Sequence, residues 1–228
     1  RNQCHHWSGH IFRGCLMGIN IKNIPNGKWK ENCYVVSNLY SDALIIDPGG
    51  AEKIIYNFIK DKNLNVQAIL NTHSHYDHVG AIKILKDKLL IPLFLHSKDE
   101  KLLNSANLYS DLFDGIGPIA IPTVDHYYDQ IDIQDYIKNF SIKVIFTPGH
   151  TKGGVCLLIE DCLFTGDTLF KGDIGRVDLP GGEELTLKKS LKIISKFPIH
   201  TKIYPGHGAV STIEKELKYN KRFIQAIQ

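Results

Sequence analysis

Residues 71–78 (NTHSHYDH) constrain this chain more than any other stretch of its sequence. The segment follows an apolar run that is typical of a buried strand. Because side chains alternate along an extended segment, His73 and His75 should point to the same side. We expect Asp77 to be the N-cap of a helix predicted by the next apolar residues, so that the chain turns there and His78 faces a different point. One strand-to-helix loop can therefore serve two metal ions.

Three strand-like runs in the second half of the chain each lead to a further residue that can bind a metal. These residues are His150, Asp167 and His207, and each has glycine or proline beside it. Glycine and proline allow a tight turn and a close approach of the backbone to a bound group. Imidazole and carboxylate groups are ordinary ligands of divalent metals. Together with residues 71–78, these strand ends predict one metal centre.

Two other histidines are not predicted to be ligands. His96 ends a strand-like run alone and is interpreted as structural. His126 lies within residues 105–130, which are rich in Gly, Pro, Asp and Tyr and have no clear period. We expect residues 105–130 to form a long surface loop of the kind that often borders an active site.

The composition indicates one large domain that binds neither nucleic acid nor a membrane. A chain of 228 residues with 43% apolar residues can bury a substantial core. Two of the 27 basic residues, Arg1 and Arg13, lie in a stretch without acidic residues, and the remaining 25 are balanced by 24 acidic ones. This balance provides no basic surface for nucleic acid. No apolar run reaches about 18 residues, so no membrane span is expected.

Residues 1–16 do not resemble the rest of the chain. A strand-like pattern starts directly after Met17, so we interpret residues 1–16 as a disordered or non-native leader and residues 17–228 as the domain. The five cysteines are an odd number without a CxxC pair, which favours a reducing, cytoplasmic compartment. Cys33 and Cys156 lie in apolar runs, where a thiol usually acts as a small core hydrophobe.

The remaining patterns predict alternating strands and helices. Short apolar runs favour strands at about 19–24, 33–36, 43–46, 66–70, 91–95, 144–146, 163–164 and 203–204. Helical spacing predicts helices at about 51–60, from the histidine segment to about 88, at about 183–197 and at about 213–227. Residues 97–100 resemble a capping box that opens a short helix.

In residues 71–78 and at His150, Asp167 and His207, the sequence resembles the metallo-β-lactamase superfamily. Within it, the sequence resembles the short, bacterial-type members of the glyoxalase II-like group of hydroxyacylglutathione hydrolases. The resemblance extends from Met17 to Gln228 and also rests on residues 166–182, 205–208 and 211–214 and on Asn220. It implies an α+β fold, the four-layer αββα sandwich, with two mixed sheets packed face to face, helices on the outside and metals at one edge.

The resemblance also implies how the ligands are shared between two metal ions. The first ion would be held by His73, His75 and His150, the second by Asp77, His78 and His207, and Asp167 would bridge both. Zinc is the expected metal, with iron or manganese as alternatives, because imidazole and carboxylate ligands suit all three. Zinc β-lactamases typically have cysteine at the position of Asp167, so the resemblance disfavours antibiotic hydrolysis.

The implied activity is hydrolysis of a small thioester of the S-2-hydroxyacylglutathione type. Two divalent ions about 3.5 to 4 Å apart lower the pKa of a shared water towards about 7, which gives a bridging hydroxide, and they polarise the carbonyl. Asp77 is expected to be catalytic, because its carboxylate can accept a hydrogen bond from that hydroxide and orient it. Arg176 and Lys171 are candidates to hold a substrate carboxylate. Asp47 either orients a metal ligand from behind or shapes a turn.

Two alternatives stay open. The persulfide dioxygenase branch shares the Gly-Arg-x-Asp segment but uses one iron held by two histidines and an aspartate. A non-catalytic, metal-stabilised module would keep the ligands without turnover. Full-length glyoxalase II enzymes continue after the last histidine with a helical domain that holds glutathione, whereas 21 residues follow His207 here. The acyl group, the thiol and the oligomeric state are therefore left open.

Overall fold

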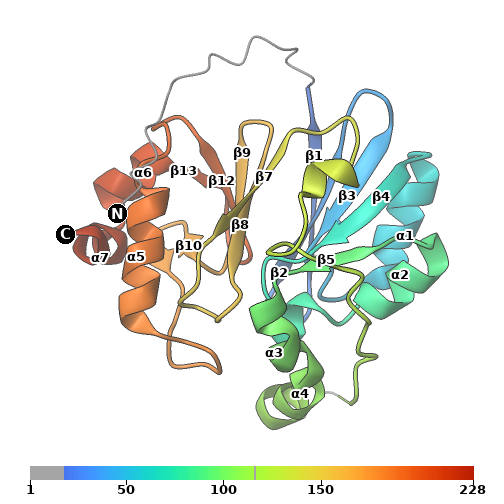
Figure 1. The fold of residues 1–228 in the computed structure, drawn as a ribbon, viewed down its shortest axis with the longest axis horizontal. Helices are drawn as coiled ribbons and strands as arrows, with labels where there is room; N and C mark the ends of the chain where they lie inside the picture. The colour runs from blue at the N-terminus through green and yellow to red at the C-terminus, as the bar shows by residue number, and fades with distance from the viewer. Residues whose placement is uncertain (1–17, 116) are drawn as a thin grey trace.

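Two mixed β-sheets lie face to face with helices on their outer sides (Figure 1). The computed structural model describes residues 18–115 and 117–228. The predicted leader, residues 1–16, and its boundary at residue 17 lie outside the described residues. The layers confirm the αββα sandwich that was expected from the sequence. No helix in the described ranges is long and apolar enough to cross a membrane.

The first half of the chain forms a six-stranded sheet. Its strands, in spatial order, are β1 (Asn20–Asn26), β2 (Glu31–Ser37), β3 (Asp42–Ile46), β4 (Asn65–Leu70), β5 (Leu93–Leu95) and β6 (His126–Tyr127). The pairs from β1 to β3 are antiparallel, and those from β3 to β6 are parallel. Parallel neighbours end at the same edge of a sheet. The histidine segment begins directly after β4, at that edge.

The second half forms a five-stranded sheet and a small hairpin. The sheet contains, in spatial order, β13 (Ser211–Thr212), β12 (Lys202–Pro205), β9 (Cys162–Gly166), β8 (Val155–Ile159) and β7 (Ile142–Phe146), and the hairpin consists of β10 (Leu169–Phe170) and β11 (Asp173–Ile174). Strands β9 and β12 are parallel, with Gly166 opposite Pro205. Because β8 is antiparallel to both β7 and β9, the ends of β7, β9 and β12 share one edge. The residues that follow these strands therefore come together.

The central strands of the first sheet, β2 to β5, are largely buried because both faces of the sheet are covered there. On β2, Cys33 and Val35 face the outer helices, whereas Tyr34 and Val36 face the second sheet. The aromatic rings of Tyr34 and Phe164 meet edge to face across the two sheets, with centroids 5.3 Å apart. This two-sided burial produces the continuous apolar runs that were read as strands.

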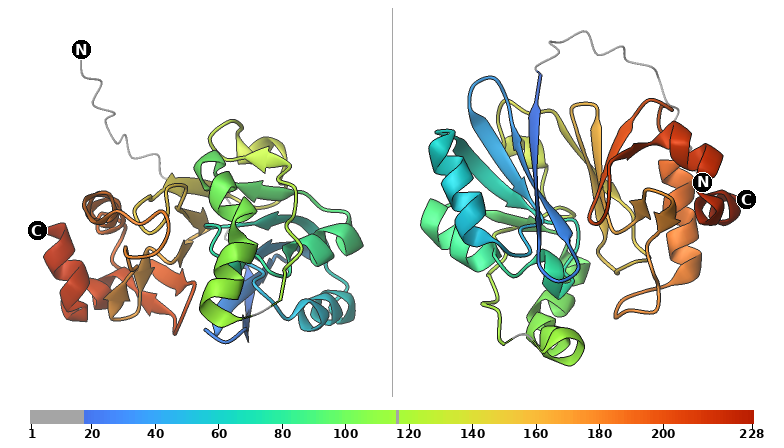
Figure 2. Two further views of the ribbon diagram at one scale, coloured as in Figure 1. Left: turned by 90° about the horizontal axis from the view of Figure 1, so that it is seen from below. Right: turned by 180° about the vertical axis from the view of Figure 1, so that it is seen from behind.

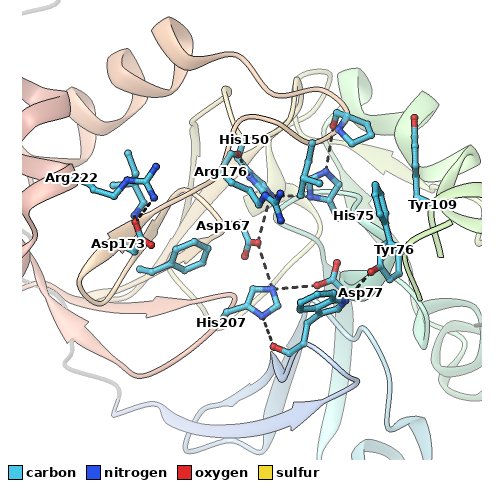
Figure 3. A pocket seen from close by; sticks show the side chains of 16 residues that line it. His75, Tyr76, Asp77, Tyr109, His150, Asp167, Asp173, Arg176, His207 and Arg222 are labelled. Carbon is cyan, nitrogen blue, oxygen red and sulfur yellow. Dashed lines mark hydrogen bonds and ion pairs between the residues drawn. The ribbon is translucent and has the colours of Figure 1, made fainter. Parts of the chain in front are cut away.

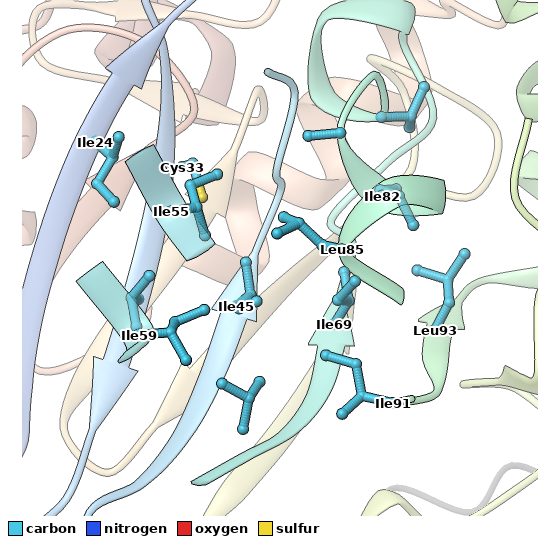
Figure 4. Packing of buried hydrophobic residues seen from close by; sticks show 14 of the residues in the cluster. Ile24, Cys33, Ile45, Ile55, Ile59, Ile69, Ile82, Leu85, Ile91 and Leu93 are labelled. Atoms are coloured by element: carbon cyan, nitrogen blue, oxygen red, sulfur yellow. The ribbon is translucent and has the colours of Figure 1, made fainter. Parts of the chain in front are cut away.

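Helices with one apolar stripe cover the outer faces. The helices on the first sheet are α1 (Glu52–Asp61) and α2 (Ile82–Leu89), and those on the second are α5 (Glu184–Ile194), α6 (Ile213–Tyr219) and α7 (Lys221–Ile227). Figure 4 shows Ile55 and Ile59 of α1 and Ile82 of α2 packed towards Ile45 and Ile69 of the sheet. Burial of each such side chain stabilises the fold by about 1.5 to 3 kcal/mol. The two outer layers flank the paired sheets in both views of Figure 2.

The sequence-based predictions for two segments outside the metal centre are wrong. Residues 106–114 belong to helix α4 (Ala106–Asp114), which follows α3 (Glu100–Asn104), and not to a loop. The terminal helix is interrupted at Asn220, whose side chain accepts a hydrogen bond from the Phe223 amide and donates to the Asp173 carbonyl. A residue that caps a new helix cannot also continue the preceding one, so α6 ends there.

Candidate metal centre

The histidine segment bends at a short 3₁₀ turn, Tyr76–His78, after β4. The prediction that Asp77 caps the next helix is wrong, because α2 begins at Ile82 and has no side-chain cap. The Asp77 carboxylate instead points towards the centre, with Oδ2 3.3 Å from Nε2 of His207. The turn frees this carboxylate for a metal.

The first donor set, which comprises His73, His75 and His150, joins the two sheets. All three side chains are buried, and one ring nitrogen of each lies within 4.8 Å of the others. Nδ1 of His75 is 2.9 Å from Nε2 of His150. Within residues 18–115 and 117–228, Nε2 of His73 is buried without a hydrogen-bond partner. Buried polar atoms rarely lack a partner, so this nitrogen indicates a site for a bound group.

The second donor set, which comprises Asp77, His78 and His207, has the same compactness. Nε2 of His78 lies 3.2 Å from Nε2 of His207. Asp167 stands between the sets: its Oδ2 is 3.5 Å from Nε2 of both His150 and His207, and its Oδ1 is 3.5 Å from Nε2 of His78. The structure thus brings together all seven ligands predicted from the sequence.

Hydrogen bonds on the outer side of three imidazole rings aim the other nitrogen at the centre. Nδ1 of His150 lies 2.8 Å from the Arg176 carbonyl, and Nδ1 of His207 lies 3.0 Å from the Trp29 carbonyl. Nε2 of His75 lies 3.3 Å from a backbone carbonyl, that of Pro180. A carbonyl accepts the N–H of a neutral ring, which leaves the lone pair on the opposite nitrogen. This arrangement fits two divalent cations.

Electrostatics differ between the two donor sets. Burial, together with neighbouring histidines, holds the pKa of His73 and of His150 well below the ordinary value, and burial lowers the pKa of His75 to about 4. Burial is the largest effect on His78 and His207 and disfavours their charge, but the carboxylates of Asp167 and Asp77 together, with Asp47 for His78, outweigh it and raise the pKa of both. The first set therefore presents neutral imidazoles, whereas the second lies in a negative field that attracts a cation.

Asp47 orients a ligand from behind. Its Oδ2 lies 3.2 Å from Nδ1 of His78 and accepts a hydrogen bond from the Thr72 hydroxyl, while its Oδ1 accepts from the Thr72 amide. Of the two roles considered for Asp47, these contacts support the orienting one. Glu31 was not recognised in the sequence; it is buried, with Oε1 3.9 Å from the same nitrogen of His78.

Asp99 supports both loops that carry the first donor set, and sequence reasoning missed it. Its buried carboxylate accepts hydrogen bonds from the amide of Ser74, the hydroxyl of Thr151 and the amide of Gly153. In the sequence, Asp99 was taken as part of a capping box. That prediction is wrong, because the Ser97 hydroxyl donates to Asp129 instead of capping the helix.

Glycine is required where the backbone passes close to the donors. A Cβ at position 206 would lie 2.2 Å from Oδ1 of Asp167 and 2.7 Å from Cε1 of His78. A Cβ at position 49 would lie 1.6 Å from the carbonyl oxygen of Asp77. Glycine removes both clashes, so these positions leave room for the centre.

A cavity of about 690 Å³ opens onto the centre, and five of the seven ligand candidates line it. These are His75, Asp77, His150, Asp167 and His207. Arg176 also lines the cavity (Figure 3), but its exposed guanidinium pairs with both carboxylate oxygens of Asp178. Lys171 is exposed and is not among the lining residues. Whether either cation holds a substrate stays a prediction.

The sequence profile of the metallo-beta-lactamase superfamily matches residues 26–207, a range that spans every donor described above. The chain belongs to this superfamily. The fold is also similar to two solved structures. The B3 metallo-beta-lactamase BLEG-1 has a TM-score of 0.82 and 35% identity, covering 89% of this chain and 98% of that one. TTHA1623, solved in a di-iron-bound form, has a TM-score of 0.78 and 32% identity, covering 88% and 98%.

Two curated relatives extend the comparison to named hydrolases. The probable metallo-hydrolase YqgX of Bacillus subtilis is 38% identical over 206 residues, which cover 87% of this chain and 95% of the relative. The hydroxyacylglutathione hydrolase GloC of Haemophilus influenzae is 32% identical over 207 residues, covering 89% and 97%. Both relatives match along nearly their whole length. The family, the fold and a metal-dependent hydrolase are therefore established for this chain.

Proposed function

We propose that the protein is a binuclear metal-dependent thioesterase that acts on S-2-hydroxyacylglutathione-type substrates. The observation that carries this proposal is the pair of donor sets joined by Asp167, whose two oxygens face ligands of both sets. The similarity to GloC supports the substrate class. A mononuclear dioxygenase would need only one of the two sets.

Two divalent ions in these sets would make bound water acidic and polarise the thioester carbonyl. Zinc is proposed for both positions, and the di-iron form of TTHA1623 makes iron the main alternative. The donor types themselves suit either metal.

Asp77 is proposed to orient the attacking water. Hydrogen bonds and positive neighbours, His78 first, outweigh burial and keep the pKa of Asp77 well below its usual range. Its carboxylate is therefore ionised and can accept a hydrogen bond from water in the cavity. A thiolate leaves readily, so no side chain is nominated as a general acid.

Arg176 is proposed to bind a carboxylate of the substrate, and Lys171 to attract it from farther out. Arg176 lies on the cavity wall, and its backbone carbonyl accepts the hydrogen bond of His150. The pair that its side chain forms with Asp178 is exposed, and exposed pairs contribute only about 0 to 1 kcal/mol. A substrate carboxylate can therefore displace Asp178.

β-Lactam hydrolysis is a second candidate because BLEG-1 carries that name and is 35% identical. The same centre can polarise a lactam carbonyl. Typical zinc β-lactamases have cysteine at the position of Asp167. We therefore rank β-lactam hydrolysis below thioester hydrolysis for this chain.

One experiment separates these possibilities. Metal content is measured on the purified protein. The metal-loaded protein is then assayed without oxygen on S-lactoylglutathione and on a cephalosporin. A parallel assay with oxygen uses glutathione persulfide as the substrate. We expect about two ions per chain and the highest kcat/KM for the thioester. Activity that requires iron and oxygen would move the protein to the dioxygenase branch, and metal content without turnover of any substrate would identify a non-catalytic module.

We also propose a cytoplasmic location. Cys33, Cys156 and Cys162 are free thiols, as expected where thiols stay reduced. These three are the cysteines of the described residues, and the distribution of the native protein between cell fractions tests the proposed location.

A further inference from the structure

One wall of the cavity is aromatic and is assembled from three separate segments. It consists of Trp29 in the turn between β1 and β2, Tyr76 in the histidine segment, and Tyr109 and Phe113 on α4. The ring of Phe113 is stacked with those of Tyr76 and Tyr109, with centroids 6.4 Å and 6.2 Å apart. We call these four residues the aromatic wall.

The aromatic wall begins at the metal centre itself. Tyr76 lies between two ligand candidates in the sequence, and the Trp29 carbonyl lies 3.0 Å from Nδ1 of His207. Figure 3 shows Tyr76 and Tyr109 on the side of the cavity beyond His75 and Asp77, away from Arg222 and Asp173. A group attached to a carbonyl held at the centre can therefore reach this wall.

Asp114, at the end of α4, holds the wall together. Its side chain is 1% exposed, and its Oδ2 accepts hydrogen bonds from Nε1 of Trp29 and from the hydroxyl of Tyr76, each at 3.0 Å. Its Oδ1 accepts from Nζ of Lys28 at 2.9 Å. The carboxylate thus ties the turn, the histidine segment and the helix to one point.

These contacts use the indole N–H of Trp29 and the hydroxyl of Tyr76, while Nζ of Lys28 lies over the Trp29 ring, 5.2 Å from its centroid, so that one face of that ring is left for a ligand. The Nε1 of Trp29 and the hydroxyl of Tyr76 are both bonded to Asp114, yet Trp29 and Phe113 are 50% and 44% exposed. Lys28, the cation beside them, is paired with the same carboxylate. The aromatic wall therefore offers apolar faces without an unmatched charge, which suits an aromatic group that can stack.

We propose that the aromatic wall binds an aromatic side chain on the acyl group, so that aryl-substituted 2-hydroxyacyl thioesters are the preferred substrates. This inference rests on the proposed function and specifies its acyl group. Asp114 acts as a positioning residue, because it touches the wall and not the substrate. Arg176, which lines the same cavity but is not part of the aromatic wall, is left for the carboxylate of the thiol part.

The first test compares two glutathione thioesters that differ only in the acyl substituent, a methyl group in the lactoyl ester and a phenyl group in the mandeloyl ester. We expect kcat/KM to favour the phenyl substrate by tenfold or more. Phe113→Ala and Asp114→Asn should each reduce this ratio about tenfold. Leu112→Ala is the matched control, since Leu112 is the neighbouring residue on α4, is 68% exposed and does not line the cavity.

The second test does not depend on turnover. Calorimetry measures the affinity of S-benzylglutathione and S-methylglutathione, which are not hydrolysed, for the parent protein and for the same three variants. We expect at least fivefold tighter binding of the benzyl thioether by the parent and by Leu112→Ala, and loss of this difference in Phe113→Ala and Asp114→Asn. Equal affinity of the two thioethers for the parent overturns the inference. Failure to hydrolyse either thioester refutes the proposed function instead. The thioether affinities then test, without turnover, whether the aromatic wall binds an aromatic group.

Discussion

Replacing Asp99 with asparagine should weaken the hold on one metal ion and spare the other. The carboxylate accepts hydrogen bonds from Ser74, beside His73 and His75, and from Thr151 and Gly153, beside His150. The Asp99 carboxylate thus holds both loops that carry the first donor set. Among the described residues, no hydrogen bond of Asp99 reaches a member of the second set.

The size of the effect follows from the donors around Asp99. Its Oδ1 faces one amide N–H, and its Oδ2 faces another together with the Thr151 hydroxyl. Whichever way the side-chain amide of the Asp99→Asn variant is placed, its NH₂ group faces a buried N–H, and that N–H loses its acceptor. An unsatisfied buried donor costs about 1 to 3 kcal/mol. Loss of an outer residue that orients ligands typically weakens metal binding about tenfold to a hundredfold.

In the assay, a coloured chelator of known affinity competes with the metal-loaded protein for the bound ions. In Asp99→Asn, one ion should be released at tenfold to hundredfold lower chelator concentration, and the other as in the parent. Asp129→Asn is the matched control, because Asp129 also accepts two hydrogen bonds from a neighbouring residue, Ser97, but contacts neither histidine loop. Equal weakening of both ions, or unchanged release of both, would refute the assignment of Asp99 to the first donor set.

Three further outcomes are expected. Asp77→Asn should lower kcat about a hundredfold or more while KM changes little, because removal of a positioned proton acceptor typically has an effect of that size; unchanged kcat at normal metal content would exclude the role. Arg176→Ala should raise KM for a carboxylate-bearing thioester about tenfold and leave kcat nearly unchanged, because the guanidinium is exposed. The increase in KM should be smaller at high salt. An equal increase with an uncharged thioester would place the carboxylate site elsewhere. The lowered pKa values of the first donor set and the raised pKa of His78 predict that at pH 7 the first ion displaces no proton from its histidines, whereas the second displaces at least one. Titration calorimetry in buffers of different ionisation enthalpy counts these protons, and release confined to the first ion would contradict the assignment.

Residues that end strands could be found in the sequence because their signals are local. His150, Asp167 and His207 each follow an apolar run and stand beside glycine or proline. The parallel pairing of β9 with β12 then brings the last two together, as the resemblance implied.

Residues that act across long distances in the chain could not be found in this way. Asp99 contacts Ser74 and Gly153, which are 25 and 54 positions away, and its sequence neighbours resemble a capping box. Helix α4 was missed because its exposed apolar residues, Leu108, Leu112 and Phe113, form no inward stripe. The engagement of Arg176 with Asp178 depends on how the cavity rim turns, which no periodicity reports.

The two donor sets become complete at different points along the chain. The first needs nothing beyond His150, whereas the second needs His207, on the strand-end loop after β12. Because a chain is synthesised from its N-terminus and folds as it emerges, the first three histidines can meet while β12 and β13 have yet to be made. The direction of translation therefore allows an order of loading, in which one ion can connect the first sheet to the loop after β7 before the second sheet has its last strands.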